Sequence, residues 1–169
     1  MLEWIQPVTD RSQSDVSRLL ELLKKGWDDF TADERTEWTA GMKGALNRSD
    51  MQRIQNNTQL LSEVLELDLT IADVPAHPNE QFLAAVLANT EIIRNAYMIH
   101  SDTPETPQMP VNTYQKLNDI EKILNDVYSI LMSNFNYYCG TEIYAGEETG
   151  LLLDRRMTMA FEKKIWKDR

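Results

Sequence analysis

Histidine and cysteine, the side chains most often used for metal binding and nucleophilic catalysis, are nearly absent: the 169 residues include two histidines and one cysteine. His77 lies between alanine and proline, His100 follows an apolar helical stretch, and neither has neighbours at metal-ligand spacing. One cysteine cannot form an intrachain disulfide, and Cys139 has no basic neighbour that would stabilise a thiolate. We therefore expect no metal, no other cofactor and no cysteine nucleophile.

Glycine is also scarce, with six residues, and neither G-x-G-x-x-G nor G-x-x-x-x-G-K-[ST] occurs, so a phosphate-binding glycine loop is not supported. The adjacent carboxylates Asp28–Asp29 and Glu147–Glu148 are interpreted as solvated surface, because a catalytic pair would need burial. The sequence predicts that the protein is not an enzyme. A site built from acidic and aromatic side chains is kept as a third hypothesis.

Positive charge is in deficit, with 17 Lys and Arg against 27 Asp and Glu and a net charge of -10. Residues 151–169 hold six basic and three acidic residues, or +3, which leaves -13 on the rest of the chain. We expect this basic end to contact another acidic surface, or the acidic body of the chain itself, rather than nucleic acid, which needs many Lys and Arg to displace counterions.

Long apolar runs are missing too: none approaches the ~20 residues of a membrane helix. The first ten residues, MLEWIQPVTD, lack the basic start and apolar core of a signal peptide. We therefore expect no membrane partner and no export, with the chain made in the cytoplasm.

A hydrophobic content of 42% and a charged content of 26% are typical of a globular protein. The apolar periodicity predicts a mainly α fold, a small bundle of about five helices with a short irregular or β C-terminal element. The helices are expected at about 12–25, from 31, from 49, at 79–99 and at 112–135. The whole is divided into an N-terminal helical module (1–67), a linker (68–78), a helical hairpin with a proline-rich connector (79–136) and a C-terminal β or irregular tail (137–169), which together form one compact unit.

Helix starts are marked by residues that cap free backbone amides. Thr31 with Glu34, and Ser49 with Gln52, each have capping-box spacing. The first helix has several candidate caps, so its start is left open, whereas Gly26 after Lys25 marks its end.

Two helices have clear apolar faces. On the first lie Val16, Leu19, Leu20 and Leu23. The fifth has the strongest pattern, at Leu117, Ile120, Leu124, Val127 and Leu131, and Ile123, Tyr128, Ile130 and Phe135 widen it. A face this broad contacts more than one neighbour, so this helix is either the central core helix, which we favour, or an oligomer helix.

Amides interrupt the apolar stripe of the third helix. Asn57 lies among apolar residues such as Ile54 and Leu61, and Gln52, Gln55, Asn56 and Gln59 are close in sequence. These amides could bind a polar ligand. A hydrogen-bonded layer between helices, or exposure to water, is the favoured interpretation. The C-terminal residues after Leu153 fit both a period of two and a step of four, and we favour a small β element.

Two segments resemble a known class of proteins. Residues 9–16 are T-D-R-S-Q-S-D-V and residues 43–54 are K-G-A-L-N-R-S-D-M-Q-R-I. They are similar to segments of tail proteins from tailed bacteriophages and prophages of Gram-positive bacteria, where T-D-R-[ST]-x-x-D-V is followed, after a tryptophan and two glycines, by K-G-x-x-N-x-x-D-L-N-R-[IV]. The chain departs from this pattern at Met51 and Gln52, where leucine and asparagine are commoner. Residues 136–148, N-Y-Y-C-G-T-E-I-Y-A-G-E-E, are similar to the ends of such proteins.

The resemblance covers roughly residues 9–65 and, more weakly, 117–153. It implies a structural part of a virion, of the tail, baseplate or fibre attachment, which is assembled in the host bacterial cytoplasm. The implied partners are other virion proteins and further copies of the chain. The alternative hypothesis is a soluble cytoplasmic helical adaptor or regulatory protein without catalytic activity. Packing at helix ends is the favoured interpretation of Trp4, Trp27 and Trp38, and a partner surface is the alternative. The candidate protein interface would then comprise Trp4, Trp27, Trp38, Arg48, Arg53, Asn56 and Asn57.

Overall fold

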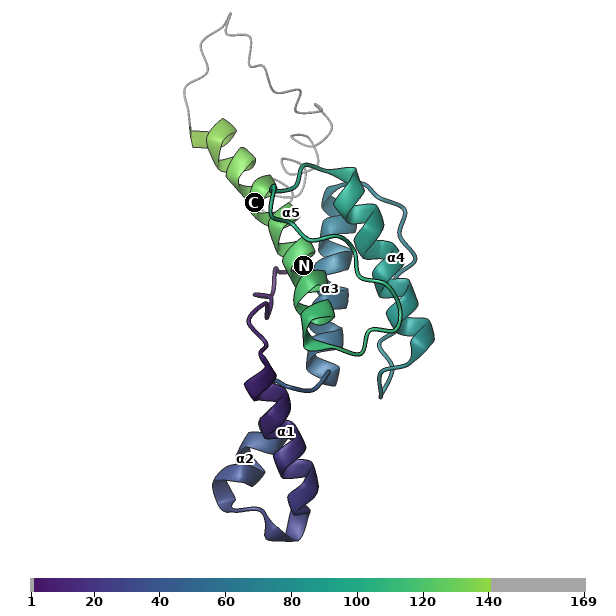
Figure 1. Cartoon of the computed structure of the whole chain (residues 1–169). Helices are drawn as coiled ribbons and strands as arrows, with labels where there is room; N and C mark the ends of the chain where they lie inside the picture. The colour runs from purple at the N-terminus through teal and green to yellow at the C-terminus, as the bar shows by residue number, and fades with distance from the viewer. Residues whose placement is uncertain (1, 141–169) are drawn as a thin grey trace, which may run out of the picture.

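The computed structural model of the chain describes residues 2–140, with side chains up to residue 134 (Figure 1). Its elements, in chain order, are α1 (Gln13–Lys25), the 3-10 turn η1 (Trp27–Asp29), α2 (Ala32–Ala40), α3 (Arg48–Val64), α4 (Glu80–Ala96) and α5 (Tyr114–Gly140). Residues 2–140 contain no strand. The predicted fold class, a mainly helical protein with five helices, is confirmed.

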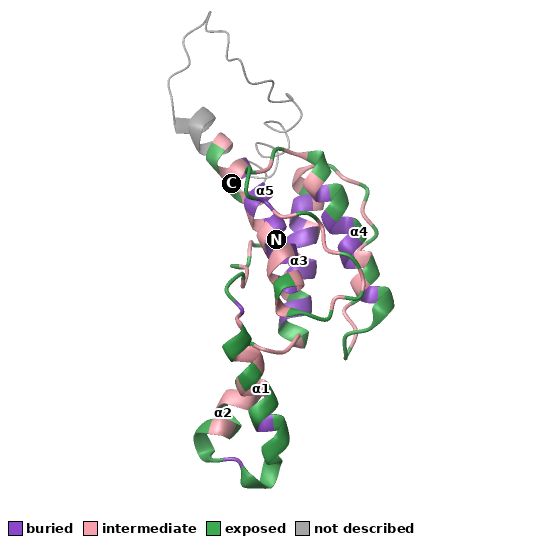
Figure 2. Ribbon diagram, in the orientation of Figure 1, coloured by how far each residue is buried: buried purple, intermediate pink, exposed green. Residues whose placement is uncertain are grey.

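The core lies in a three-helix bundle, since each of α3, α4 and α5 packs against the other two. Figure 2 shows the buried residues concentrated on the facing sides of these helices. The fully buried members include Met51 and Leu61 from α3, Ile93 from α4, and Ile120 and Val127 from α5. Burying side chains of this size contributes roughly 1.5–3 kcal/mol each, so the bundle holds most of the folding energy.

Helix α5 is the central core helix, as favoured from its sequence. The predicted stripe Leu117, Ile120, Leu124, Val127 and Leu131 is buried throughout. The helix also continues to Gly140, so the first residues assigned to a C-terminal tail are helical. The predicted β element beyond Leu153 lies outside the described residues.

Extended segments connect the bundle helices and are held to them by side-chain amides. Gln55 of α3 donates to the carbonyl of Ala72 at 2.5 Å, and Asn89 of α4 donates to that of Thr70 at 3.0 Å. Both amide side chains belong to buried residues. A buried amide needs such partners, because an unsatisfied polar group costs about 1–3 kcal/mol. These amides therefore bind extended backbone rather than a neighbouring helix.

Helices α1 and α2 form a helical hairpin that projects from one end of the bundle, which we call the arm (residues 13–45; Figure 1). A small core of its own holds it together: Leu22, Phe30 and Met42 are buried there. Trp38 packs edge-on against Phe30, with ring centroids 5.6 Å apart. The third predicted helix, α3, belongs to the bundle and not to the arm.

Two helix starts follow the expected chemistry. Ser12 caps α1 in a capping box with Asp15, which settles the open start of that helix. The predicted box of Thr31 and Glu34 caps α2: the Glu34 amide donates to the Thr31 hydroxyl, and the Thr31 amide donates to the Glu34 carboxylate. Gly26 has a φ of 73° and ends α1 as predicted.

The predicted start of α3 at Ser49 is wrong by two residues. Asn47 is the N-cap, with a φ of -81°, so the left-handed geometry that asparagine tolerates is not used here. The Asp50 carboxylate accepts from the Asn47 backbone amide at 2.9 Å. The predicted end of the fourth helix is also wrong. The helix α4 ends at the exposed residue Ala96, three residues before the predicted end at residue 99.

Candidate interaction surface

Two arginines and two carboxylates meet where the arm joins the bundle, in a cluster that we call the neck (Arg11, Asp50, Arg53 and Glu121). Arg11 precedes α1, Asp50 and Arg53 lie in the first turns of α3, and Glu121 lies near the start of α5. Nη2 of Arg11 is 3.0 Å from Asp50 Oδ1 and 2.7 Å from Glu121 Oε1. Nε of Arg53 is 2.8 Å from Glu121 Oε2. The neck thereby ties α1, α3 and α5 together.

The neck is shielded from water: the side chains of Arg11 and Glu121 are each 1% exposed. Each oxygen of Glu121 accepts two hydrogen bonds, and one of these comes from the backbone amide of Val8 at 2.8 Å. The two positive and two negative charges balance. Such a cluster stabilises a fold less than apolar packing does, but its charge-assisted hydrogen bonds are directional, and they fix the directions of the attached elements although Nε of Arg11 is buried without a described partner.

The charges of the neck shift the ionisation of its members. Burial alone would raise the pKa of Asp50, but the Asn47 amide and the guanidinium groups of Arg53 and Arg11 outweigh burial and lower it. Hydrogen bonding to Glu121 raises the pKa of Arg53. Both residues therefore stay charged in the folded chain at neutral pH.

Gly44 brings the end of the arm against its beginning. A Cβ added at Gly44 would lie 2.2 Å from the carbonyl oxygen of Asp15 and 2.8 Å from the amide nitrogen of Val16. Only glycine permits this approach, because the obstructing atoms are backbone in the first turn of α1. The two segments that carry the resemblance, 9–16 and 43–54, thus lie side by side.

The first residues of the chain form an extended strap (residues 2–12) along the bundle. Asn57 of α3 binds both polar groups of the Ile5 backbone, at 3.0 Å and 2.7 Å. Asn118 of α5 does the same for Arg11, at 3.3 Å and 2.9 Å. Trp4 stacks on Tyr128 with ring centroids 3.9 Å apart. Side-chain amides, buried at Asn57 and half-buried at Asn118, therefore hold the strap at two points, as other amides hold the connecting segments.

Replacing Asn57 with alanine is expected to lower the free energy of unfolding by about 2 kcal/mol, because its 1%-exposed amide makes two bonds to Ile5. The matched control is Asn56→Ala, which removes an exposed bond to the Glu3 carbonyl and a longer one, at 3.3 Å, to Asn57 Oδ1, and should cost less than about 1 kcal/mol. Urea unfolding followed by circular dichroism measures both, and hydrogen exchange reports the Ile5 amide. Equal losses in the two variants would contradict the role of Asn57 in holding the strap.

Ion pairs clamp the two helices of the arm. Arg18 of α1 is 2.9 Å from Glu37 of α2, and Lys25 is 2.7 Å from Glu34. The hydrogen bond from Lys25, followed by that from the Thr31 backbone, lowers the pKa of Glu34 from 4.5 to about 2. Glu34 thus caps α2 and links it to α1 at the same time.

Acid is expected to loosen the arm through Glu34. Because its pKa is lower in the folded chain, the stability it contributes is complete above about pH 4.5 and is lost as the pH falls towards 2. Glu34→Gln removes this contribution, so its urea midpoint should lie below that of the wild type at pH 7 and approach it at pH 3. A difference that stays the same at both pH values would rule out this linkage.

The outer side of the arm exposes large apolar side chains. The sequence placed Val16, Leu19, Leu20 and Leu23 on one apolar face, but the structure divides it: Leu22 enters the core of the arm, whereas Leu20 and Leu23 are 49% and 57% exposed. Trp27 is 50% exposed beyond the end of α1. In Figure 2 most of the arm is exposed or intermediate. We call Leu20, Leu23 and Trp27 the arm stripe.

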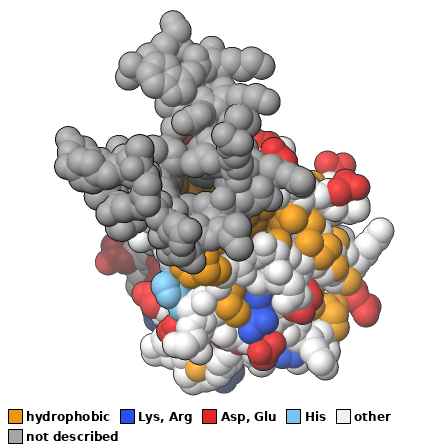
Figure 3. Space-filling view, turned by 90° about the horizontal axis from the view of Figure 1, so that it is seen from above, with side chains coloured by type: hydrophobic (Ala, Val, Ile, Leu, Met, Phe, Trp, Pro, Cys, Tyr) orange, Lys and Arg blue, Asp and Glu red, His pale blue; other side chains and the backbone are white. Residues whose placement is uncertain are grey.

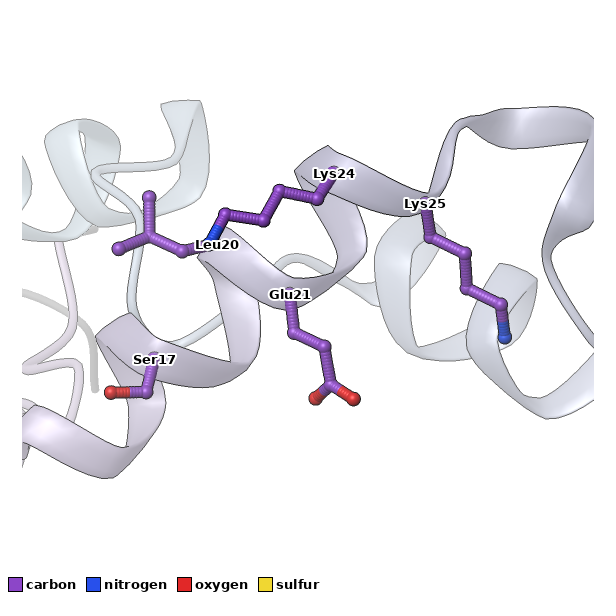
Figure 4. A pocket seen from close by; sticks show the side chains of 5 residues that line it. All are labelled: Ser17, Leu20, Glu21, Lys24 and Lys25. Atoms are coloured by element: carbon purple, nitrogen blue, oxygen red, sulfur yellow. The ribbon is translucent and has the colours of Figure 1, made fainter.

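A shallow open groove lies beside the stripe (Figure 4). Its lining residues are Ser17, Leu20, Glu21, Lys24 and Lys25. The Lys24 side chain extends along the helix towards Leu20, while Glu21 and Lys25 point to another side. The groove is an open part of the helix surface and not an enclosed pocket.

The seven candidate interface residues lie in different environments. Trp27 is exposed in the arm stripe and Trp38 is half-buried, whereas Trp4 belongs to the strap. Arg48 is exposed and forms no ion pair with a described residue. The remaining three contact the chain itself: Arg53 the neck, and Asn56 and Asn57 the strap. A contact of Arg48, Arg53, Asn56 and Asn57 with another subunit stays a prediction, and Arg48 is the member of this group that is exposed and not held by another described residue.

Comparison of the chain with protein-family models, with curated proteins and with solved structures found no match. Within residues 2–140 no group of three or more His, Cys, Asp or Glu is placed to hold a metal ion. The helices of the same part are too short or too polar to cross a membrane. Figure 3, which looks onto the end of the bundle opposite the arm, shows apolar side chains interspersed with acidic and basic ones. In the arm, Leu20 and Leu23 of α1 and Trp27 of η1 are large apolar side chains that are each about half exposed.

The sequence did contain a signal for the neck. Glu121 interrupts the broad apolar stripe of α5, next to Ile120 and one turn after Leu117. A charge in such a position needs a buried partner of opposite sign. The sequence does not identify the arginine that is the partner of Glu121, because Arg11 is 110 residues away in the chain.

Proposed function

We propose that the chain is a structural component of a bacteriophage virion, of the tail, baseplate or fibre attachment, which acts by binding other virion proteins and further copies of itself. The observation that carries the assembly role is the arm: a helical hairpin that is anchored by a buried neck and exposes Leu20, Leu23 and Trp27 to a partner. Exposed apolar and aromatic residues of this kind are enriched in protein interfaces.

The placement in a virion rests on the resemblance of residues 9–16 and 43–54 to phage tail proteins. The structure is compatible with this origin, because the two segments meet at the neck and would be retained together as one structural unit. In a particle with many copies, each contact can be small, because neighbouring subunits raise the effective concentration of the next one.

Mass spectrometry of purified particles tests the proposal. Particles from lysed host cells are banded on a density gradient and compared with the soluble fraction of the same lysate. We expect the chain to co-purify with the particles in a fixed ratio to their major tail protein. If the chain stays in the soluble fraction, the virion proposal fails and the cytoplasmic adaptor is favoured.

A further inference from the structure

We infer that the outward side of α4 binds the basic segment of the same chain, residues 151–169. This side, which we call the α4 face, is formed by Ala84, Ala88, Glu91, Ile92 and Asn95. The segment lies outside the described residues, and its charge and side chains are known from the sequence. Neither the contact nor its tests require the chain to be part of a particle.

The α4 face lies between the extended segments that come before and after the helix. Asn89 binds the segment before α4 through the Thr70 carbonyl at 3.0 Å, and Arg94 binds the segment after it through the Pro104 carbonyl at 2.9 Å. With 3.6 residues per turn, the α4 face occupies one arc between Asn89 and Arg94, and the opposite arc holds the buried residues of the helix. All five residues of the face are exposed, Ile92 by 44%. No other described element therefore covers the α4 face.

The surroundings of the α4 face are acidic. Residues 54–115, which include α4 and both extended segments, hold eight Asp and Glu against one Lys or Arg, or -7. That single base, Arg94, is already paired with Glu105, and its side chain is 12% exposed. Exposed carboxylates that form no ion pair with a described residue are Glu66, Asp68, Asp73 and Glu80. A basic partner would therefore meet negative charge with little competition from cations of the bundle.

Residues 151–169 have the complementary composition. Six Lys and Arg against three Asp and Glu give this segment a charge of +3. Large apolar residues recur in it at steps of four, at Leu153, Met157, Phe161 and Ile165. Ala84, Ala88 and Ile92 have the same spacing, and the two alanines leave room for larger side chains of a partner. The segment thus matches the α4 face in both charge and side-chain size.

The chain leaves α5 close to the C-terminal end of α4. Nδ2 of Asn134 donates to the hydroxyl of Tyr97, which directly follows α4, at 2.9 Å. The helix α5 then continues for six residues to Gly140, or about 9 Å. Residues 141–150 span up to about 33 Å, which exceeds the length of α4, about 25 Å for 17 residues. A tether this short gives an effective concentration of roughly millimolar, which favours the same chain over a second copy.

Zero-length cross-linking of the full chain tests the contact. A carbodiimide joins a lysine amine to a carboxylate that lies against it, and mass spectrometry identifies the linked residues. We expect the lysines of residues 151–169 to be joined to carboxylates within residues 66–91, in preference to exposed acids of the arm such as Asp28 and Asp33. Links mainly to the arm, or no links, would overturn the assignment to the α4 face.

Isotope labelling separates a contact within one chain from a contact between copies. Equal amounts of unlabelled and 15N-labelled chains are mixed before cross-linking. A contact within the chain gives linked peptides that carry one isotope only, whereas a contact between copies also joins labelled to unlabelled peptides. Mixed pairs that are as frequent as unmixed ones would overturn the assignment to the same chain.

Paramagnetic broadening in the full chain tests the side chains of the face. In a Cys139→Ser background, a spin label attached through Trp166→Cys should broaden the amide signal of Ala88. Ile92→Asn removes apolar contact without changing the charge and should restore most of the lost intensity. The control Leu20→Asn makes the same kind of change at a 49% exposed residue of the arm and should restore none. Equal effects of the two variants would overturn the inference, as would an Ala88 signal that the label leaves sharp.

Discussion

Replacing Glu121 with glutamine is expected to destabilise the folded chain by about 3–5 kcal/mol, one of the two largest effects that the structure predicts. Both oxygens of Glu121 accept two hydrogen bonds, from Arg11, Arg53 and the Val8 amide. The amide of glutamine would turn two N–H groups towards donors and leave Arg11, which is 1% exposed, with one carboxylate partner. Urea unfolding at pH 7 measures the loss.

The control for this variant is Glu105→Gln. Glu105 pairs with Arg94 at 2.9 Å, but its side chain is 88% exposed, so the same chemical change should cost less than about 1 kcal/mol. A double variant, Arg11→Met with Glu121→Leu, removes one charge of each sign and should recover much of the stability, because apolar residues can replace a buried ion pair. A loss in Glu121→Gln no larger than that of the control would refute the buried neck.

Gly44→Ala is expected to cost about 3 kcal/mol and to separate the end of the arm from its beginning. The added Cβ would lie 2.2 Å from the Asp15 carbonyl oxygen. A change of side-chain rotamer cannot relieve this clash, because neither the Cβ nor the backbone oxygen moves when side-chain torsion angles change. Larger residues at this position should cost little more than alanine, because the first added atom already clashes. Urea unfolding gives the total loss, and hydrogen exchange should show faster opening of the first turn of α1.

Ser49→Ala serves as the control, since Ser49 is exposed at the start of α3 and its change should stay within about 0.5 kcal/mol. If Gly44→Ala is as stable as the wild type, Gly44 does not pack on α1 in solution. The arm would then be attached by the neck alone.

The parts of the fold that depend on neighbouring residues were predictable from the sequence. The cap formed by Thr31 and Glu34, the end of α1 at Gly26 and the buried stripe of α5 all follow from groups within a few turns of each other. The same local chemistry failed at α3. There Ser49 and Gln52 have suitable spacing, but Asp50 is used by Asn47 and the neck at once, so the helix starts earlier.

The candidate site was predictable in part. Trp27 was expected at an interface, and the structure exposes it. The sequence does not tell that Leu22, rather than Leu20 or Leu23, packs into the core of the arm. Four leucines and a valine within eight residues cover most of the circumference of a short helix. Which side is buried is decided by Phe30 and Met42, and their position depends on the turn at η1.

The strap illustrates why long-range pairs escape sequence analysis. Asn57 was singled out as an unexpected amide in an apolar stripe, and its burial among core residues was the informative feature. Its partner, the backbone of Ile5, offers no side-chain signal because every residue has the same amide and carbonyl groups. An amide in an apolar stripe is therefore the same sequence signal whether its partner is another subunit or the strap of the same chain.

We expect the neck and Gly44 to hold the arm in one orientation, so that the arm stripe is presented at a fixed angle to the bundle. The three anchoring elements converge there: Arg11 before α1, Asp50 in α3 and Glu121 in α5. A fixed presentation matters for assembly, because a mobile arm would lose orientational freedom at every contact and bind more weakly.

Pulsed electron–electron double resonance tests this claim most directly. Spin labels are attached through Thr36→Cys on α2 and Ala84→Cys on α4, both exposed positions, in a Cys139→Ser background and diluted with unlabelled chain. If the neck fixes the arm, this chain gives one narrow distance distribution, and the distribution becomes broad after Glu121→Gln is added. A broad distribution in the chain with an intact neck would contradict it.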